Sequence, residues 1–246
     1  MRLLLCISML NGNGYKISAI AKMGPEEIYD TCRDLNKVED EFAYAINSLV
    51  LAMIEFDEER IEKLISESFS KYGFEDSMTK VIYPFFSRVG ILWQTGTIRP
   101  LQEHFASNIV RQKLISAIDN LESTKDPKAP SYVVFLPQHE YHEIGLLFGG
   151  YILRKYNNNV IYLGQNVPES DLDMIYESFE PNYFFTMLTV APPKDTTVGF
   201  LNRIGKKFPK SKILASGAAT YGLAAVPDNV IVLSSASELN RYAIHG

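Results

Sequence analysis

Five short apolar runs alternate with helical stretches in the second half of this 246-residue chain, and this alternation constrains the fold more than any other feature. The runs cover residues 132–136, 160–163, 183–188, 212–215 and 230–233. Helices are expected between them, near residues 141–156, 170–179, 194–208 and 219–225. Strands that alternate with helices predict a parallel, doubly wound sheet, which we expect to form one domain over residues 128–246.

The preceding part of the chain, residues 35–127, has the apolar period of helices instead. Asp57 is expected to cap the second of four helices, and Gly73 to end it. Asp76 is expected to cap the third helix, which Pro84 should bend. Four amphipathic helices with short links predict a four-helix bundle. Its apolar stripes include Leu49, Met53, Ile61, Ile65, Met78, Ile82, Phe85, Val89, Trp93, Leu101, Ile109 and Leu114.

Bulk properties exclude several classes of protein. Residues 1–34 are expected to form short helices that are too small to bury a core alone. The formal net charge of −5 argues against a chain that mainly wraps nucleic acid. Cys6 and Cys32 cannot by themselves build a disulfide framework or a zinc site, so we expect a cytoplasmic protein. The apolar opening, residues 1–10, is too short to span a membrane, and no membrane partner is expected.

A hexapeptide, Glu140-Tyr141-His142-Glu143-Ile144-Gly145, closely follows the first strand-like run. Neutral imidazole at His142 can offer one ring nitrogen to a metal, while the Glu140 carboxylate holds the other ring N–H and sets the tautomer. Gly145 removes a side chain where a large flat cofactor would approach the backbone. A histidine beside a glutamate is more often a plain surface pair, so both interpretations stay open at this point.

Two further segments are expected beside this loop. Ligands of doubly wound sheets bind beyond the carboxyl ends of the strands. Thr186 and Leu188 end the third predicted strand, and Ser216-Gly217 follows the fourth. The three segments should therefore converge on one rim of the sheet.

These residues together resemble the cobalamin-binding regulators of the MerR type, including the light-sensing ones. The chain is also similar to the corrinoid modules of methionine synthase and of corrinoid methyltransferase proteins. The resemblance implies a flavodoxin-like or Rossmann-like sheet of five parallel strands and cobalamin as the cofactor. Members carry an Asp/Glu-x-His-x-x-Gly loop, matched here by Glu140, His142 and Gly145. By this resemblance, His142 is the lower cobalt ligand and displaces the cofactor's own dimethylbenzimidazole.

The resemblance extends to the other two segments of the rim. A Ser/Thr-x-Leu segment that borders the displaced nucleotide tail is matched by Thr186-Met187-Leu188. The third element is usually a Gly-Gly pair, whereas this chain has Gly217-Ala218. The added methyl group would narrow the slot for the tail.

In the helical part, Trp93 is followed after nine residues by Glu103-His104, as in the photoreceptor-type regulators. The match implies that Trp93 covers the upper axial group and that Glu103 contacts an adenosyl ligand. His104 would bind cobalt once the adenosyl group leaves. Adenosylcobalamin, held between the bundle and the sheet domain, is therefore the expected form. Without the motif, a tryptophan on an apolar stripe is more often a core residue of its helix, and a glutamate near a helix start is an acid that the helix dipole favours. These interpretations of Trp93 and Glu103 stay open.

Residues 1–34 resemble the last helix pair of a MerR-type winged-helix domain, so DNA contact is expected only through a domain largely absent from these residues. The preferred function is a regulatory cobalamin sensor that is not an enzyme, forms a homo-oligomer and has light as its candidate signal. The alternative is a corrinoid carrier that presents methylcobalamin to a methyltransferase and therefore needs an open upper face. A third interpretation is a scaffold of the same fold that binds no corrin.

Overall fold

A computed structural model of the chain describes residues 3, 6, 7, 10, 11, 14–34, 41–122, 126–191, 196–223 and 225–245. The chain divides into two compact units, Met1–Val110 (unit 1) and Arg111–Gly246 (unit 2), and each is described by itself. The division falls inside one helix, α8 (Pro100–Asp119). Among the described residues, no helix is both long and apolar enough to cross a lipid bilayer.

Unit 1 is built from helices, and its long helices α4, α5, α7 and α8 are those that the apolar period predicts. Helix α4 packs against α5, η2 and α7, and the side chains that it buries include Leu49 and Met53. Within residues 1–34, the stretch that resembles part of a winged-helix domain, the positions outside the described residues are 1, 2, 4, 5, 8, 9, 12 and 13. The elements before α8 are α2 (Ile17–Ile20), α3 (Pro25–Asp34), α4 (Glu41–Glu55), α5 (Glu58–Tyr72), α6 (Phe74–Ser77), the π-helical turn η2 (Met78–Ile82) and α7 (Tyr83–Gln94).

Two of the three expected helix boundaries in unit 1 are confirmed. The Asp57 side chain accepts a hydrogen bond from the Arg60 N–H (3.0 Å) at the start of α5, and Gly73 ends that helix with a φ of 78°. Asp76 as a cap is wrong, because Gly73 also starts α6 and Asp76 lies inside that helix. Pro84 lies in the first turn of α7, directly after the π-helical turn. Proline has no N–H to donate, so the regular helical pattern is interrupted there.

Unit 2 is a five-stranded parallel sheet with helices on both faces, which confirms the predicted fold class. The strand order is β2-β1-β3-β4-β5, and every pairing in it is parallel. The strands are β1 (Ser131–Pro137), β2 (Asn159–Val167), β3 (Tyr183–Met187), β4 (Lys212–Ser216) and β5 (Val230–Val232). The helices are α9 (Glu143–Lys155), α10 (Leu172–Phe179), α11 (Thr197–Lys207) and α12 (Ala236–His245), with the short turn η3 (Glu169–Asp171) before α10.

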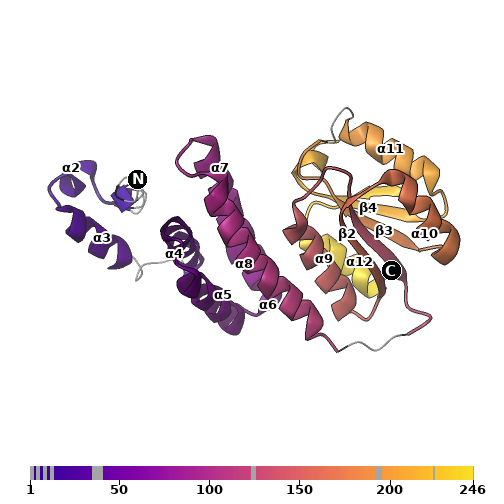
Figure 1. Cartoon of the computed structure of the whole chain (residues 1–246), viewed down its shortest axis with the longest axis horizontal. Coiled ribbons are helices and arrows are strands. Elements are labelled where there is room, and N and C mark those ends of the chain that lie inside the picture. The colour runs from indigo at the N-terminus through magenta and orange to yellow at the C-terminus, as the bar shows by residue number, and fades with distance from the viewer. Residues whose placement is uncertain are drawn as a thin grey trace. The chain divides into compact units, whose positions relative to one another are not determined.

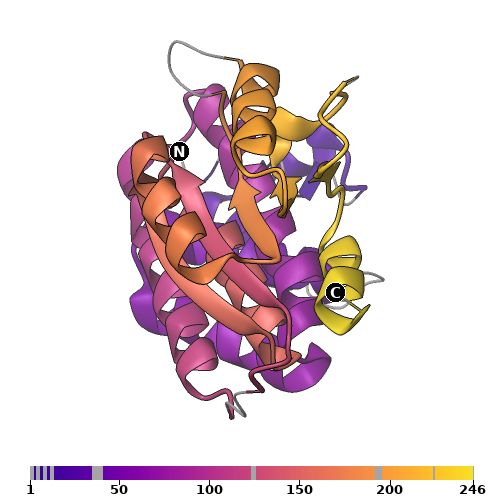
Figure 2. The ribbon, with the colours of Figure 1, turned by 90° about the vertical axis from the view of Figure 1, so that its right-hand side faces the viewer.

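Helices α10 and α11 cover one face of the sheet, and α9 and α12 lie on the other (Figures 1 and 2). On the α10 and α11 face, Phe184 stacks on Phe208 with 4.6 Å between ring centroids. On the opposite face, Gly149 of α9 lies so close to Phe185 that a Cβ atom would come within 2.2 Å of its ring. Neighbouring residues of β3 are therefore buried on opposite faces, as helices on both sides of a sheet require.

The connections after β4 differ from the expectation. The prediction of a helix near residues 219–225 is wrong, since the described residues there include only the 3-10 turn η4 (Ala218–Thr220). The Leu188 carbonyl accepts a hydrogen bond from the Ala219 N–H (2.9 Å), which ties this turn to the end of β3. Helix α12 is not among the helices that the sequence predicts. Only two of its residues are buried, so its apolar pattern is too short to be recognised.

Candidate functional site

The loop that follows β1 carries the Glu140 and His142 motif at the carboxyl edge of the sheet. The Glu140 N–H donates to the Pro137 carbonyl (3.0 Å), and α9 begins directly after His142. The His142 side chain is 60% exposed, and its Nδ1 lies 2.5 Å from Oε1 of Glu140. An imidazole held at Nδ1 by a carboxylate presents Nε2 as the ligating nitrogen, which is the arrangement of metal-binding histidines.

Glu140 is buried, and its carboxylate is surrounded by hydrogen-bond donors. Oε1 also accepts from the backbone N–H groups of Tyr141 and His142 (both 3.0 Å). Oε2 accepts from the N–H groups of Thr189 (2.8 Å) and Val190 (3.2 Å). Burial alone would raise the pKa of Glu140, but hydrogen bonds from the His142 ring and from the N–H groups of His142 and Thr189 lower it to about 2. Glu140 is therefore a fixed anion that orients the imidazole, and not one half of a loose surface pair.

Hydrogen bonds join the three motif segments at one edge of the sheet, as expected. Glu140 connects the β1 loop to residues 189–190, which follow β3. The Leu188 N–H donates to the Ser216 carbonyl (2.8 Å) at the end of β4. The carboxyl ends of β1, β3 and β4 therefore form one continuous rim.

Gly217 is required at this rim by the backbone of the protein itself. Its φ is 109°, and a Cβ atom there would come within 2.4 Å of the Leu188 carbonyl oxygen. Only glycine tolerates both the left-handed conformation and this close approach. Ala218, which departs from the family's Gly-Gly pair, is exposed.

Thr186 and Leu188, at the end of β3, are both buried but have different surroundings. Leu188 belongs to the hydrophobic core beneath α10 and α11. The Thr186 hydroxyl is buried and has no hydrogen-bond partner among the described residues. Buried polar groups are nearly always paired, so this hydroxyl is open to a further partner, which ordered water or a bound ligand can supply. It fits the polar nucleotide tail that the sequence motif implies.

The first turn of α9 adds contacts that the sequence analysis missed. Gly145 lies there and is half-buried. Glu143 is buried next to His142, and its carboxylate accepts hydrogen bonds from Arg111 Nε (2.8 Å) and from the Tyr162 hydroxyl (3.1 Å). Burial and the Glu143 carboxylate raise the pKa of Tyr162. These contacts attach the second half of α8 to α9 within unit 2. The sequence analysis missed them because residues so far apart in the chain produce no repeating pattern in the sequence.

The residues expected at the upper face of the cofactor lie in unit 1. Trp93, near the end of α7, is 55% exposed, so its assignment to the core stripe of that helix is wrong. Glu103 and His104 lie in the first turns of α8, and His104 Nδ1 is 3.1 Å from Oε2 of Glu103. The His104 side chain is 68% exposed. All three side chains are at least partly available to a ligand.

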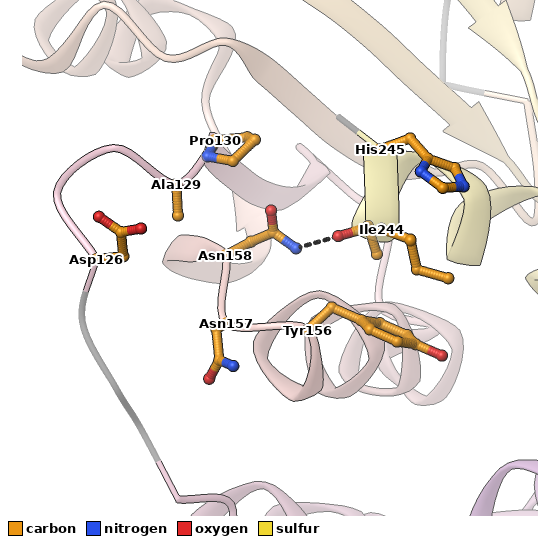
Figure 3. A pocket seen from close by; sticks show the side chains of 9 residues that line it. Asp126, Ala129, Pro130, Tyr156, Asn157, Asn158, Ile244 and His245 are labelled. Atoms are coloured by element: carbon orange, nitrogen blue, oxygen red, sulfur yellow. Dashed lines mark hydrogen bonds between the residues drawn. The ribbon is translucent and has the colours of Figure 1, made fainter.

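Two cavities of unit 2 lie away from the motif residues. One of about 340 Å³ is at the amino-terminal edge of the sheet, where Asp126, Pro130, Asn158 and His245 line it (Figure 3). There the Asn158 amide donates to the Ala243 carbonyl (2.8 Å) and joins the end of α9 to α12. The other, of about 460 Å³, lies against α12. Neither cavity is lined by a residue of the loop that carries His142, of residues 186–190 or of Ser216-Gly217.

The helical part of the chain is similar to a cofactor-binding family. Residues 45–116 match the family described as the B12 binding domain. Over 186 residues, or 75% of the chain, the sequence is 25% identical to the HTH-type transcriptional repressor CarH of Myxococcus xanthus. The chain spans 61% of the length of that relative.

Among solved structures, the chain resembles the monomethylamine corrinoid protein of Methanosarcina barkeri. The TM-score is 0.60 at 15% identity, over 84% of this chain and 96% of that protein. This similarity establishes the fold, a helical part followed by a parallel sheet with helices. The family match confirms cobalamin as the cofactor predicted from the motifs. The predicted resemblance to cobalamin-binding transcriptional regulators is therefore confirmed, with a match to the B12 binding domain over residues 45–116.

Proposed function

We propose that this chain is the cobalamin-binding sensor module of a transcriptional regulator, with His142 as the lower ligand of cobalt. The observation that carries the proposal is the pair of a buried Glu140 carboxylate and an exposed His142 ring at the carboxyl edge of a parallel sheet. One histidine suffices because the macrocycle supplies the equatorial ligands. The B12 binding domain and the similarity to a transcriptional repressor support a sensor in the cytoplasm.

Each residue of the rim has one task in this proposal. Glu140 fixes the ring orientation of His142, and Gly145 leaves room for the flat cofactor above the start of α9. The buried Thr186 hydroxyl hydrogen-bonds the nucleotide tail, which gives this group the partner that it otherwise lacks among the described residues. Gly217 lets the end of β4 approach Leu188, so that the rim keeps its shape.

Three residues of unit 1 are assigned to the upper ligand. The Trp93 indole excludes water, Glu103 accepts a hydrogen bond from a ribose hydroxyl, and His104 provides a second imidazole. Bound adenosylcobalamin supplies a cobalt–carbon bond that light can break. We infer that this change alters the homo-oligomeric state of the chain and, through it, the DNA affinity of the regulator.

The test is spectroscopic and uses the whole 246-residue chain. Adenosylcobalamin is added in the dark and then illuminated, while absorption spectra and size-exclusion chromatography follow ligation and oligomeric state. We expect His142→Ala to lose the histidine-ligated spectrum, and His245→Ala, exposed at the end of α12, to keep it. A histidine-ligated spectrum in His142→Ala would refute the lower-ligand assignment.

The same experiment separates the sensor from the corrinoid carrier. The exposed Trp93 side chain and the Glu103-His104 pair, which the sequence motif links, favour a covered upper face and hence the sensor. Tight binding of methylcobalamin without binding of adenosylcobalamin would instead establish a carrier. Identical spectra and elution volumes before and after illumination would refute the light response.

A further inference from the structure

Strand β2 is irregular where it passes the loop that carries His142. Its pairing with β1 slips between Val134 and Phe135 and again between Phe135 and Pro137, and each slip adds one residue to β2. Gly164 (φ 81°) and Asn166 (φ 59°) lie in this irregular stretch. Bulges of this kind re-aim side chains beside functional sites.

The Asn166 side chain is aimed at the loop of residues 138–142, which we call the lower-ligand loop. Its Oδ1 accepts a hydrogen bond from the His139 N–H (2.9 Å). His139 also has a left-handed backbone, with a φ of 71°. Two residues in a sparsely populated conformation on neighbouring segments are thus joined by one hydrogen bond. Such conformations cost energy and persist where the surrounding structure holds them.

The lower-ligand loop is consequently held from both strands that flank β1. On the β3 side, Glu140 accepts hydrogen bonds from Thr189 and Val190. On the β2 side, Asn166 holds the residue that precedes Glu140. The sheet order β2-β1-β3 makes this two-sided attachment possible.

We propose that Asn166 is a positioning residue that holds the lower-ligand loop so that His142 meets cobalt in the correct orientation. This inference rests on the proposed cobalamin function. Asn166 acts through the backbone of His139 and does not touch the metal. Asparagine suits the position because it supplies an acceptor oxygen and also tolerates a left-handed backbone.

Three substitutions separate the hydrogen bond from the backbone conformation. Asn166→Gly keeps the left-handed backbone and removes the acceptor, whereas Asn166→Asp keeps an acceptor oxygen. Asn157→Gly is the matched control, because Asn157 follows α9 at the other edge of the sheet with the same φ of 59°. Adenosylcobalamin is titrated into each variant in the dark, and hydrogen exchange of the His139 amide is measured on the cofactor-free protein.

We expect Asn166→Gly to bind adenosylcobalamin about tenfold more weakly and to show a reduced histidine-ligated spectrum, because residues that orient a metal-binding histidine affect its affinity on this scale. Its His139 amide should exchange about fivefold faster, the effect of one lost hydrogen bond. Asn166→Asp and Asn157→Gly should behave as the wild-type chain does. Wild-type affinity and exchange in Asn166→Gly, or an equal loss in Asn166→Asp, would overturn the inference. Failure of the wild-type chain to bind any cobalamin would overturn the proposed function, and the exchange rates would still decide whether Asn166 holds the loop.

Discussion

Replacement of Glu140 by glutamine tests whether a fixed anion organises the rim. The carboxylate accepts five hydrogen bonds, three at Oε1 and two at Oε2. A glutamine amide has a single acceptor oxygen. In either orientation its NH2 group therefore faces at least two of these donors, which lose their acceptor.

The expected cost can be worked out from these bonds. Hydrogen bonds to a charged group contribute roughly 1.5–3 kcal/mol each. Loss of two should lower the free energy of unfolding of unit 2 by about 3 kcal/mol. The ionisation of Glu140 gives the same scale, because a pKa lowered from 4.5 to about 2 corresponds to about 3 kcal/mol.

Urea unfolding followed by circular dichroism is the assay, and the single tryptophan of the chain provides an internal reference. Trp93 lies in unit 1, so its fluorescence reports the unfolding of that unit, whereas the hydrogen bonds of Glu140 lie in unit 2. The dichroism transition of unit 2 should move to lower urea. Glu177→Gln, at an exposed position of α10, is the control and should match the wild-type chain.

The pH dependence has a defined sign. A depressed native pKa means that the stabilisation is complete above pH 4.5 and is lost as the pH falls toward 2. The difference between wild type and Glu140→Gln should shrink by about 1.4 kcal/mol per pH unit in that window. Unfolding free energies of the wild-type chain and of Glu140→Gln that agree within about 1 kcal/mol at pH 7 would show that the anion does not stabilise the rim.

Two further predictions concern stability. Gly217→Ala should destabilise unit 2 by at least about 2 kcal/mol, because a Cβ atom would lie 2.4 Å from the Leu188 carbonyl oxygen at a φ of 109°; an unchanged dichroism transition would contradict this. Asp57→Ala should lower the stability of unit 1 by about 1 kcal/mol through loss of the cap on the Arg60 N–H. Trp93 fluorescence should report that loss, and a transition at the wild-type urea concentration would show that the cap contributes nothing.

Sequence patterns located the five strands because strands covered on both faces give continuous apolar runs. The same patterns ended the second strand at residue 163, whereas β2 continues to Val167. The additional residues break the apolar run and include Gly164 and Asn166, whose left-handed backbones belong to the bulged stretch. A bulge depends on how two strands pair, and a single strand's composition does not specify it.

The helical part shows a similar division. The apolar period placed α4, α5, α7 and α8, but it put Trp93 on a buried stripe, and the side chain is 55% exposed. A helical period fixes which residues share a face, while burial at the end of a helix depends on what packs against that end. Arg111 and its ion pair with Glu143 were missed because the partners are distant in the chain.

The sequence by itself determined the order of helices and strands, the three motif segments and the cofactor that they indicate. Those features depend on local composition, spacing and the rule that parallel strands present their carboxyl ends at one edge. Only the tertiary structure decided that Glu140 is buried among five hydrogen-bond donors. It also decided that the Thr186 hydroxyl has no hydrogen-bond partner among the described residues, and that Asn166 accepts a hydrogen bond from the lower-ligand loop. Hydrogen bonds between distant segments depend on the relative placement of whole strands, which no local pattern encodes.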